Sequence, residues 1–196
     1  MEEVNLATIA NGPIAEIPAK PLRLAALLGC KSDERLAGVR IAPGPGGAGV
    51  RLEAITAQRL VRIESEEGEA STEVVLPVMP LRMMLQRHSD ADFVGVAAVA
   101  DEGLLQIRSY SESMTIAIQA PEVRAFPSLP TMLAPELAVE AEPCWLSLAE
   151  LAQTLVIFRR FCPDVALLPQ AQPHPLLMRL QGAGFKAEVH LARLER

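Results

Sequence analysis

One pattern recurs three times along this chain: a short extended stretch, a helix of a few turns, and then alternating strands joined by Gly-rich or polar turns. The predicted helices begin near Pro21, Pro80 and Ser147, a spacing of roughly sixty residues. A repeat of this length indicates a supersecondary unit that cannot bury its apolar face alone. We therefore expect the three units to share a sheet, with their helices on one face of it.

The first unit is predicted from its alternating apolar residues. Ile14 to Ile17 is extended, and a helix over residues 20–30 places Leu24, Leu27 and Leu28 on one face. Its strands are expected at residues 36–43, 50–56 and 59–65. The Gly-rich segment at residues 43–49 joins two of these strands. It lacks the Lys-Ser/Thr pair and the following helix of a phosphate-binding loop, so a hairpin loop is the better interpretation.

The second unit repeats the pattern and ends in a proline-rich stretch. Residues 73–76 are extended, Pro80 begins a helix, and strands are expected at residues 93–99, 104–110 and 113–119. Residues 120–143 contain five prolines and are predicted to be a linker.

The third unit has the clearest local signals. Ser147 and Glu150 have the spacing of a capping box, and Pro163 should end the helix. Strands are expected at residues 165–169, 175–181 and 185–192. The buried face of the helix is predicted to consist of Leu148, Leu151, Ala152, Leu155 and Phe158.

These units define an α+β chain of three parts. Residues 1–13 are a tail, and the proline-rich stretch divides the rest into residues 14–135, which hold the first two units, and residues 136–196, which hold a linker and the third unit. The chain has 196 residues, half of them apolar, which is enough for a substantial core. The N-terminus is acidic and lacks a signal pattern, so we expect a cytoplasmic protein.

No residue type points to catalysis or to a cofactor. The cysteines are odd in number and widely spaced, as expected of reduced thiols in apolar surroundings, and the histidines are predicted to lie on the surface without metal spacing. We therefore expect no metal, no cofactor and no enzymatic activity. The residues concerned are Cys30, Cys144, Cys162, His88, His174 and His190.

The predicted helices are basic although the whole chain has a net charge of −6. A row of helices on one face would place these cations in a strip that could contact the phosphate backbone without reading bases. An alternative is that Lys31, Arg87, Arg159 and Arg160 only interact with the C-terminal dipoles of their helices. The basic residues, opposed by the single acid Glu150, are Lys20, Arg23, Lys31, Arg82, Arg87, Arg159 and Arg160.

Three short segments carry a resemblance to a known family. Residues 53–60 (Glu-Ala-Ile-Thr-Ala-Gln-Arg-Leu), residues 75–77 (Val-Leu-Pro) and residues 126–130 (Phe-Pro-Ser-Leu-Pro) are similar to segments of the bacterial sliding clamp, the DNA polymerase III β subunit. In that alignment residues 14–135 resemble the middle domain of the clamp, and residues 141–194 the second half of its last domain. The resemblance implies the DNA-clamp fold.

The resemblance also implies a function and partners. A clamp-like chain would tether a polymerase to double-stranded DNA during replication, acting as a processivity factor through contacts independent of sequence. Its DNA-binding residues would be Lys20, Arg23, Arg82, Arg87, Arg159 and Arg160. A clamp-derived module that binds proteins without encircling DNA is the alternative, and the net acidity of the chain favours it.

The family docks peptides of its polymerase and loader partners in an apolar pocket. The resemblance places Thr56, Arg59 and Leu60 on one wall and Val189 and Leu191 on the other. Simple core packing of these strand residues is the alternative.

The resemblance also concerns assembly. The ring of the family contains twelve such units, so four copies of this three-unit chain would complete one, and a homo-oligomer is expected. An incomplete clamp that acts as a decoy or as part of a mixed assembly is the alternative.

Overall fold

A computed structural model describes residues 13–30, 37–90, 92–99, 104–109, 115–119, 146–162, 164–169, 176–182 and 184–192. The helices are α1 (Ala19–Leu28), α2 (Val78–Leu85) and α3 (Leu148–Phe158). Almost all of the predicted tail and the proline-rich linker lie outside the described residues, as do Lys31, Cys144, Pro163 and His174.

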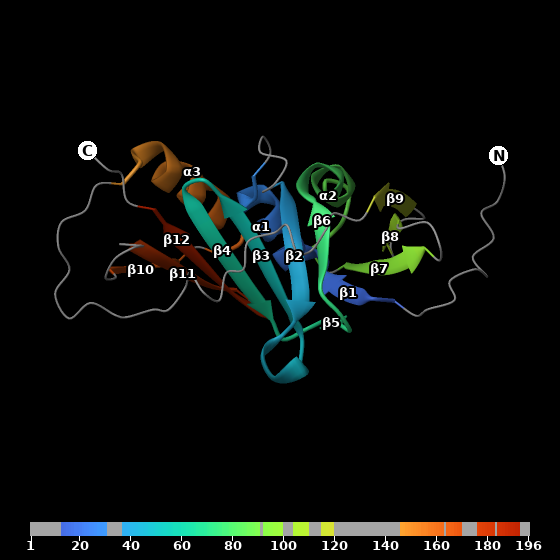
Figure 1. Ribbon diagram of the computed structural model, residues 1–196. Coiled ribbons are helices and arrows are strands. Elements are labelled where there is room, and N and C mark those ends of the chain that lie inside the picture. The colour runs from blue at the N-terminus through green and yellow to red at the C-terminus, as the bar shows by residue number, and fades with distance from the viewer. Residues whose placement is uncertain are drawn as a thin grey trace.

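The strands form two antiparallel sheets rather than one layer (Figure 1). The larger sheet has the order β10-β11-β12-β4-β3-β2-β6, and the smaller has the order β5-β1-β7-β8-β9. In chain order the strands are β1 (Ala15–Pro18), β2 (Gly38–Pro43), β3 (Val50–Thr56), β4 (Arg59–Ser65), β5 (Glu69–Ala70), β6 (Val74–Pro77), β7 (Phe93–Val99), β8 (Leu104–Ser109), β9 (Thr115–Gln119), β10 (Ala166–Pro169), β11 (Leu176–Gly182) and β12 (Phe185–Leu191).

The first two units exchange their leading strands. Strand β1 begins the first unit but pairs with β7 of the second, whereas β6 begins the second unit but pairs with β2 of the first. Each unit therefore supplies one strand to the sheet of the other. Neither of these two units therefore completes its sheet without the other.

The third unit extends the larger sheet. Strand β12 pairs with β4 along its whole length, from Phe185 opposite Ser65 to Leu191 opposite Arg59. Helix α1 packs on β3 and β4 and contacts both α2 and α3. In Figure 1, α1 lies behind the large sheet, with α2 and α3 on either side of it. The α+β clamp architecture expected from the resemblance is thus present, with the helices side by side.

The Gly-rich segment is a hairpin loop between β2 and β3, as predicted, with a short 3₁₀ turn at Pro45–Gly47. Gly49 has a φ of +67°, and a Cβ atom there would lie 2.0 Å from the carbonyl oxygen of Ser65. A side chain at this position would collide with the end of β4. The close approach of two backbones therefore requires a glycine here.

The predicted buried face of α3 is wrong at several positions. Leu148, Ala152 and Leu155 are exposed, while Thr154, Ile157 and Phe158 face the protein. The helix is rotated relative to the prediction: the face that points inward buries Ile157 and Phe158 and brings Thr154 within a hydrogen bond of Arg59 in β4.

The capping box is made only in part. The Ser147 hydroxyl accepts a hydrogen bond of 3.3 Å from the Glu150 amide, but the Glu150 carboxylate lies against Arg59 instead of returning to the N-terminus.

Two predicted surface histidines are buried. His88 follows α2, and its Nδ1 lies 2.8 Å from the Met84 carbonyl oxygen. His190 lies in β12 between Leu60 of β4 and Leu177 of β11, in the interior of the large sheet. Its place in an alternating pattern indicated a polar face, but neighbouring strands on both sides enclose it. Cys30 and Cys162 are reduced thiols of intermediate exposure, and the Cys162 Sγ lies 3.2 Å from the Gln181 carbonyl oxygen.

Candidate nucleic-acid and peptide surfaces

The predicted DNA-binding arginine on α2 makes contacts inside the protein. Arg82 donates hydrogen bonds to the carbonyl oxygens of Ala26 (2.7 Å), Leu27 (2.8 Å) and Gly29 (3.4 Å). These carbonyls lie at the C-terminal end of α1, where a helix has no internal donors for them. Burial lowers the pKa of the Arg82 guanidinium. The prediction that Arg82 lies on a solvated helix surface is therefore wrong.

Arg23 on α1 makes the reciprocal contact. Its guanidinium donates to the carbonyl oxygen of His88, just beyond α2, and to the carboxylate of Asp90. Each helix thus supplies one arginine to the C-terminal end of the other. This reciprocity shows that α1 and α2 run in opposite directions and are related by an approximate two-fold axis.

The other four predicted DNA-binding cations differ in exposure. Lys20 is half-buried, with its Nζ 6.0 Å from the centre of the Phe185 ring. Arg87, Arg159 and Arg160 are exposed, just beyond the C-terminal ends of α2 and α3, and make no side-chain ion pair with any described residue. These three are the described helix cations available to an external anion.

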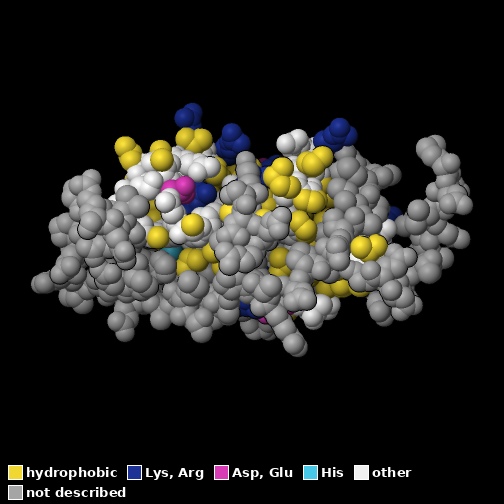
Figure 2. All heavy atoms as spheres, turned by 45° about the horizontal axis from the view of Figure 1, so that its top comes forward, with side chains coloured by type: hydrophobic (Ala, Val, Ile, Leu, Met, Phe, Trp, Pro, Cys, Tyr) yellow, Lys and Arg dark blue, Asp and Glu magenta, His cyan; other side chains and the backbone are white. Residues whose placement is uncertain are grey.

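The exposed sides of α2 and α3 are otherwise apolar, which the sequence reading missed. Figure 2 shows hydrophobic side chains next to those of Lys and Arg on this side of the molecule. The large exposed apolar residues on these helices are Met79, Met83, Leu148, Leu155 and Val156. One signal was present in the sequence: Glu150 is the single charged residue among the 11 residues of α3, and so apolar a helix is normally covered on more than one side.

The residues predicted to form a peptide pocket are brought together by the pairing of β4 and β12. Thr56 lies opposite Arg59, which lies opposite Leu191, and Val189 is next to them on the same face. Leu60 points to the other face of the sheet, beside His190. The strand pairing brings the two predicted walls next to each other, but their residues do not all share one face of the sheet. All of them except Thr56 are buried, as the alternative of core packing expects.

Arg59 connects this region to α3. Its Nη1 donates a 3.1 Å hydrogen bond to the hydroxyl of Thr154, and its Nε lies 3.1 Å from the Glu150 carboxylate. Burial lowers the pKa of Arg59, and the negative charge of Glu150 opposes that shift. The hydroxyl of Thr154 in turn donates to the Glu150 carbonyl oxygen at 2.8 Å. Arg59 therefore anchors α3 to the sheet.

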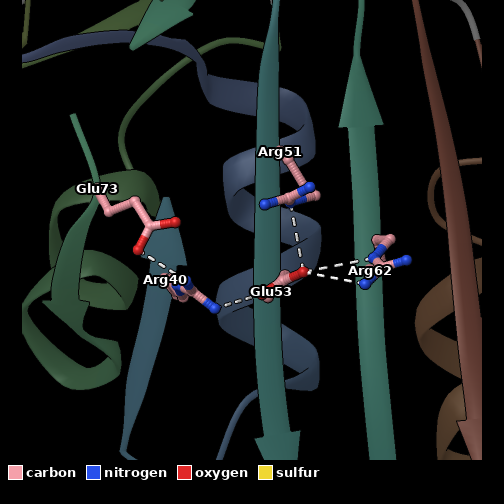
Figure 3. Close-up of polar contacts among 5 residues, drawn as sticks. All are labelled: Arg40, Arg51, Glu53, Arg62 and Glu73. Carbon is pink, nitrogen blue, oxygen red and sulfur yellow. Dashed lines mark hydrogen bonds and ion pairs between the residues drawn. The ribbon is translucent and has the colours of Figure 1, made fainter. Parts of the chain in front are cut away.

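The opposite face of the large sheet carries a network of ion pairs (Figure 3). The carboxylate of Glu53 is fully buried and lies 3.3 to 3.4 Å from guanidinium nitrogens of three arginines, Arg40, Arg51 and Arg62. Arg40 also contacts Glu73 at 2.7 Å. Further along the sheet, Arg179 and Glu188 form an exposed pair at 2.7 Å. Neighbouring strands on this face are thus linked by alternating charges.

No grouping of His, Cys, Asp or Glu suited to a metal ion occurs among the described residues. None of the described helices has the length and apolar character needed to cross a membrane. A cavity of about 360 Å³ lies at the far end of the β4–β12 pair, lined among others by Ser65, Gly182 and Phe185, and none of the predicted site residues lines it.

Comparison with known proteins finds similarity only in structure, since neither a family model nor a curated sequence matches the chain. A putative DNA polymerase III β subunit from Eubacterium rectale is 9% identical, with a TM-score of 0.59 over 93% of this chain and 66% of that one. The sliding clamp of Bartonella birtlesii bound to griselimycin is 11% identical, with a TM-score of 0.58 over 93% of this chain and 65% of that one.

Structural similarity extends beyond the bacterial β subunits to PCNA. A chain of the PCNA2–PCNA3 complex from Sulfolobus tokodaii is 11% identical, with a TM-score of 0.58 over 92% of this chain and 98% of that one. This chain thus spans about two thirds of the bacterial clamps and nearly all of that PCNA chain. The protein has the sliding-clamp fold.

Proposed function

We propose that this protein is a clamp-like, cytoplasmic and non-enzymatic DNA-associated protein, which holds a polymerase or another partner on duplex DNA during replication. The observation that carries this proposal is the clamp fold, with α2, α1 and α3 side by side and Arg87, Arg159 and Arg160 exposed on the outer helices. Exposed cations of this kind bind phosphates without selecting a base sequence.

The charge of the helix side limits the strength of this contact. Arg23 and Arg82 are used for the packing of α1 on α2, so three exposed arginines rather than six cations are the main candidates for phosphate contacts. Three lost contacts would reduce the slope of log K against log salt by about 2 to 3. The proposed binding is therefore weak and strongly dependent on salt.

The test is a salt titration of duplex binding with matched variants. Replacing Arg87, Arg159 and Arg160 together by Ala should weaken binding and flatten the salt dependence. A control with Arg108, Arg179 and Lys186 replaced by Ala loses the same charge from exposed sheet positions and should bind like the wild type. Equal losses in both triple variants, or a loss in neither, would contradict phosphate contact at the helices.

A protein-interaction module without DNA binding is the second candidate. The exposed apolar residues Met79, Met83 and Val156 lie on the same side as the three arginines, and the chain is acidic overall. Such a surface suits a protein partner better than a polyanion. Duplex binding that is absent in low salt would favour this second function.

The peptide surface at the β4–β12 pair is part of both proposals. Arg59 and Leu191 lie at the end of the paired strands, with Gln58 exposed in the turn beside them. We expect Gln58→Ala to change the affinity for a clamp-binding peptide more than the stability of the fold, because Gln58 is on the surface. Isothermal titration with such a peptide measures the affinity.

A further inference from the structure

The first two units form a pair in which each supplies a strand and a helix contact to the other. Strands β4, β3 and β2 of the first unit are followed in the sheet by β6, which the second unit supplies. Helices α1 and α2 pack against each other and exchange the contacts of Arg23 and Arg82. Both relations are reciprocal, so two units of the same kind fit each other about a two-fold axis.

The third unit contains a helix and three strands in the same order. No described strand or helix takes the place that the partner unit occupies in the first two units. Its strands have the order β12, β11, β10, and within the described residues no strand pairs with the outer edge of β10. By the repeat, this edge corresponds to the edge of β2 that β6 occupies. Leu167 in β10 is exposed. An unpaired edge of this kind is a template for another strand.

Helix α3 is exposed at positions whose equivalents in α1 and α2 are buried. The first helical residue after the N-cap is 0% exposed in α1 (Ala19) and α2 (Val78), but Leu148 in α3 is 78% exposed. At the eighth helical position Ala26 and Leu85 are each 1% exposed, whereas Leu155 is 36% exposed. Two positions that are buried in both α1 and α2 are thus exposed in α3.

The chemistry of this surface suits a second copy of itself. Leu148, Leu155 and Val156 form, with Ala149, Ala152 and Gln153, an exposed face without charge. Glu150 on the same helix is already paired with Arg59. The fifth helical position, arginine in α1 and α2, is Ala152 in α3, so two copies can approach without bringing like charges together. In an antiparallel pair, Arg159 and Arg160 of the two copies lie at opposite ends.

We infer that the third unit is completed by the third unit of a second copy. The two copies pair about a two-fold axis, with α3 packed on the partner's α3 and the edge of β10 available to the partner's chain. This contact occurs within a domain that two chains build together, and it holds whether or not the protein binds DNA.

Sedimentation equilibrium without DNA tests the inference at micromolar concentration. The wild type should have twice the chain mass of 21.1 kDa, or a higher even multiple. The double variant Leu148→Glu, Val156→Glu should lose that association while its circular dichroism spectrum stays unchanged, because both residues are on the surface. Met83→Glu, at another exposed apolar position on α2, is the matched control and should retain the contact between third units.

Charge complementation distinguishes self-pairing from other contacts. The double variant Leu148→Lys, Val156→Lys should also fail to associate, and mixing it with the Glu variant should restore the dimer, because each surface then meets its opposite charge. A monomeric wild type would overturn the inference. A Glu variant with the same mass as the wild type would overturn it, and so would a mixture that keeps the mass of the Glu variant alone, since α3 would then contact a different surface. DNA binding is measured separately, so failure of the proposed function leaves these outcomes unaffected.

Discussion

The first two units and the third share the same order of helix and strands but differ in what surrounds them. Helices α1 and α2 bury their equivalent positions against each other and use Arg23 and Arg82 to bind each other's carbonyl groups. Helix α3 contacts α1 but has no helix at the equivalent place among the described residues, and its side chains Leu148, Leu155 and Val156 are exposed. The role of a residue in this repeat therefore depends on whether its unit is paired.

The face of the large sheet that carries the Glu53 ion pairs also differs between the first and the third unit. Over the first unit, Glu53 is fully buried among three arginines, while over the third unit the pair Arg179–Glu188 is exposed to solvent. A buried charge that loses its partners is costly, whereas an exposed pair contributes little. Four predictions test this difference between the paired and unpaired regions.

The largest effect is expected at Glu53. The Glu53→Gln variant leaves three guanidinium groups around a neutral amide, so the free energy of unfolding should fall by about 3 to 5 kcal/mol. The matched variant Glu188→Gln breaks an exposed pair and should cost at most about 1 kcal/mol. Urea unfolding of both variants measures the difference. Equal losses would show that the buried network does not stabilise the first unit more than the exposed pair stabilises the third.

The eighth helical position gives the next comparison. Leu85→Ala on α2 removes a buried side chain and should lower the free energy of unfolding by about 2 to 5 kcal/mol. Leu155→Ala on α3 removes one that is partly exposed, and should cost about 0.5 kcal/mol in the monomer. The measurement therefore uses the Leu148→Glu, Val156→Glu background, in which the proposed dimer is absent. A large loss at Leu155 in that background would mean that α3 is covered within its own chain.

Much of the secondary structure could be predicted from the sequence, but the exchange of strands between units could not. The helices, most strands and the Gly-rich hairpin follow from periodicity and turn residues. The pairing of β12 with β4 also agrees with the walls predicted from the resemblance. The exchange of β1 and β6 between units could not be predicted, because alternation identifies a strand but not its partner.

The exposure of the predicted DNA-binding cations could not be predicted from the sequence either. Lys20, Arg23 and Arg82 have the same charge and helical setting in the sequence as Arg87 and Arg159, yet only the latter are exposed. Their orientation depends on which carbonyl groups lie nearby, and this is a property of tertiary packing. The two-residue strand β5 was missed because so short a segment has no measurable period.

Arg82→Ala tests the arginine exchange directly. Loss of the hydrogen bonds to Ala26, Leu27 and Gly29 should lower the free energy of unfolding by about 2 kcal/mol, since a charged donor to half-buried carbonyls is lost. Arg159→Ala removes an exposed cation and should change stability by less than about 0.5 kcal/mol. If the two variants were equally stable, Arg82 would be a surface cation in solution and a candidate for DNA contact again.

The smallest effect is expected where α3 is anchored to the sheet. Thr154→Val keeps the shape of the side chain but removes the hydroxyl that accepts from Arg59 and donates to the Glu150 carbonyl. The guanidinium of Arg59 keeps its ion pair with Glu150, so the loss should be about 1 kcal/mol. Hydrogen exchange should then quicken in α3 while α1 and α2 stay protected, because α1 and α2 are held by each other's arginines and α3 has no such exchange with a described helix. Faster exchange in all three helices would mean that the third unit unfolds together with the paired units.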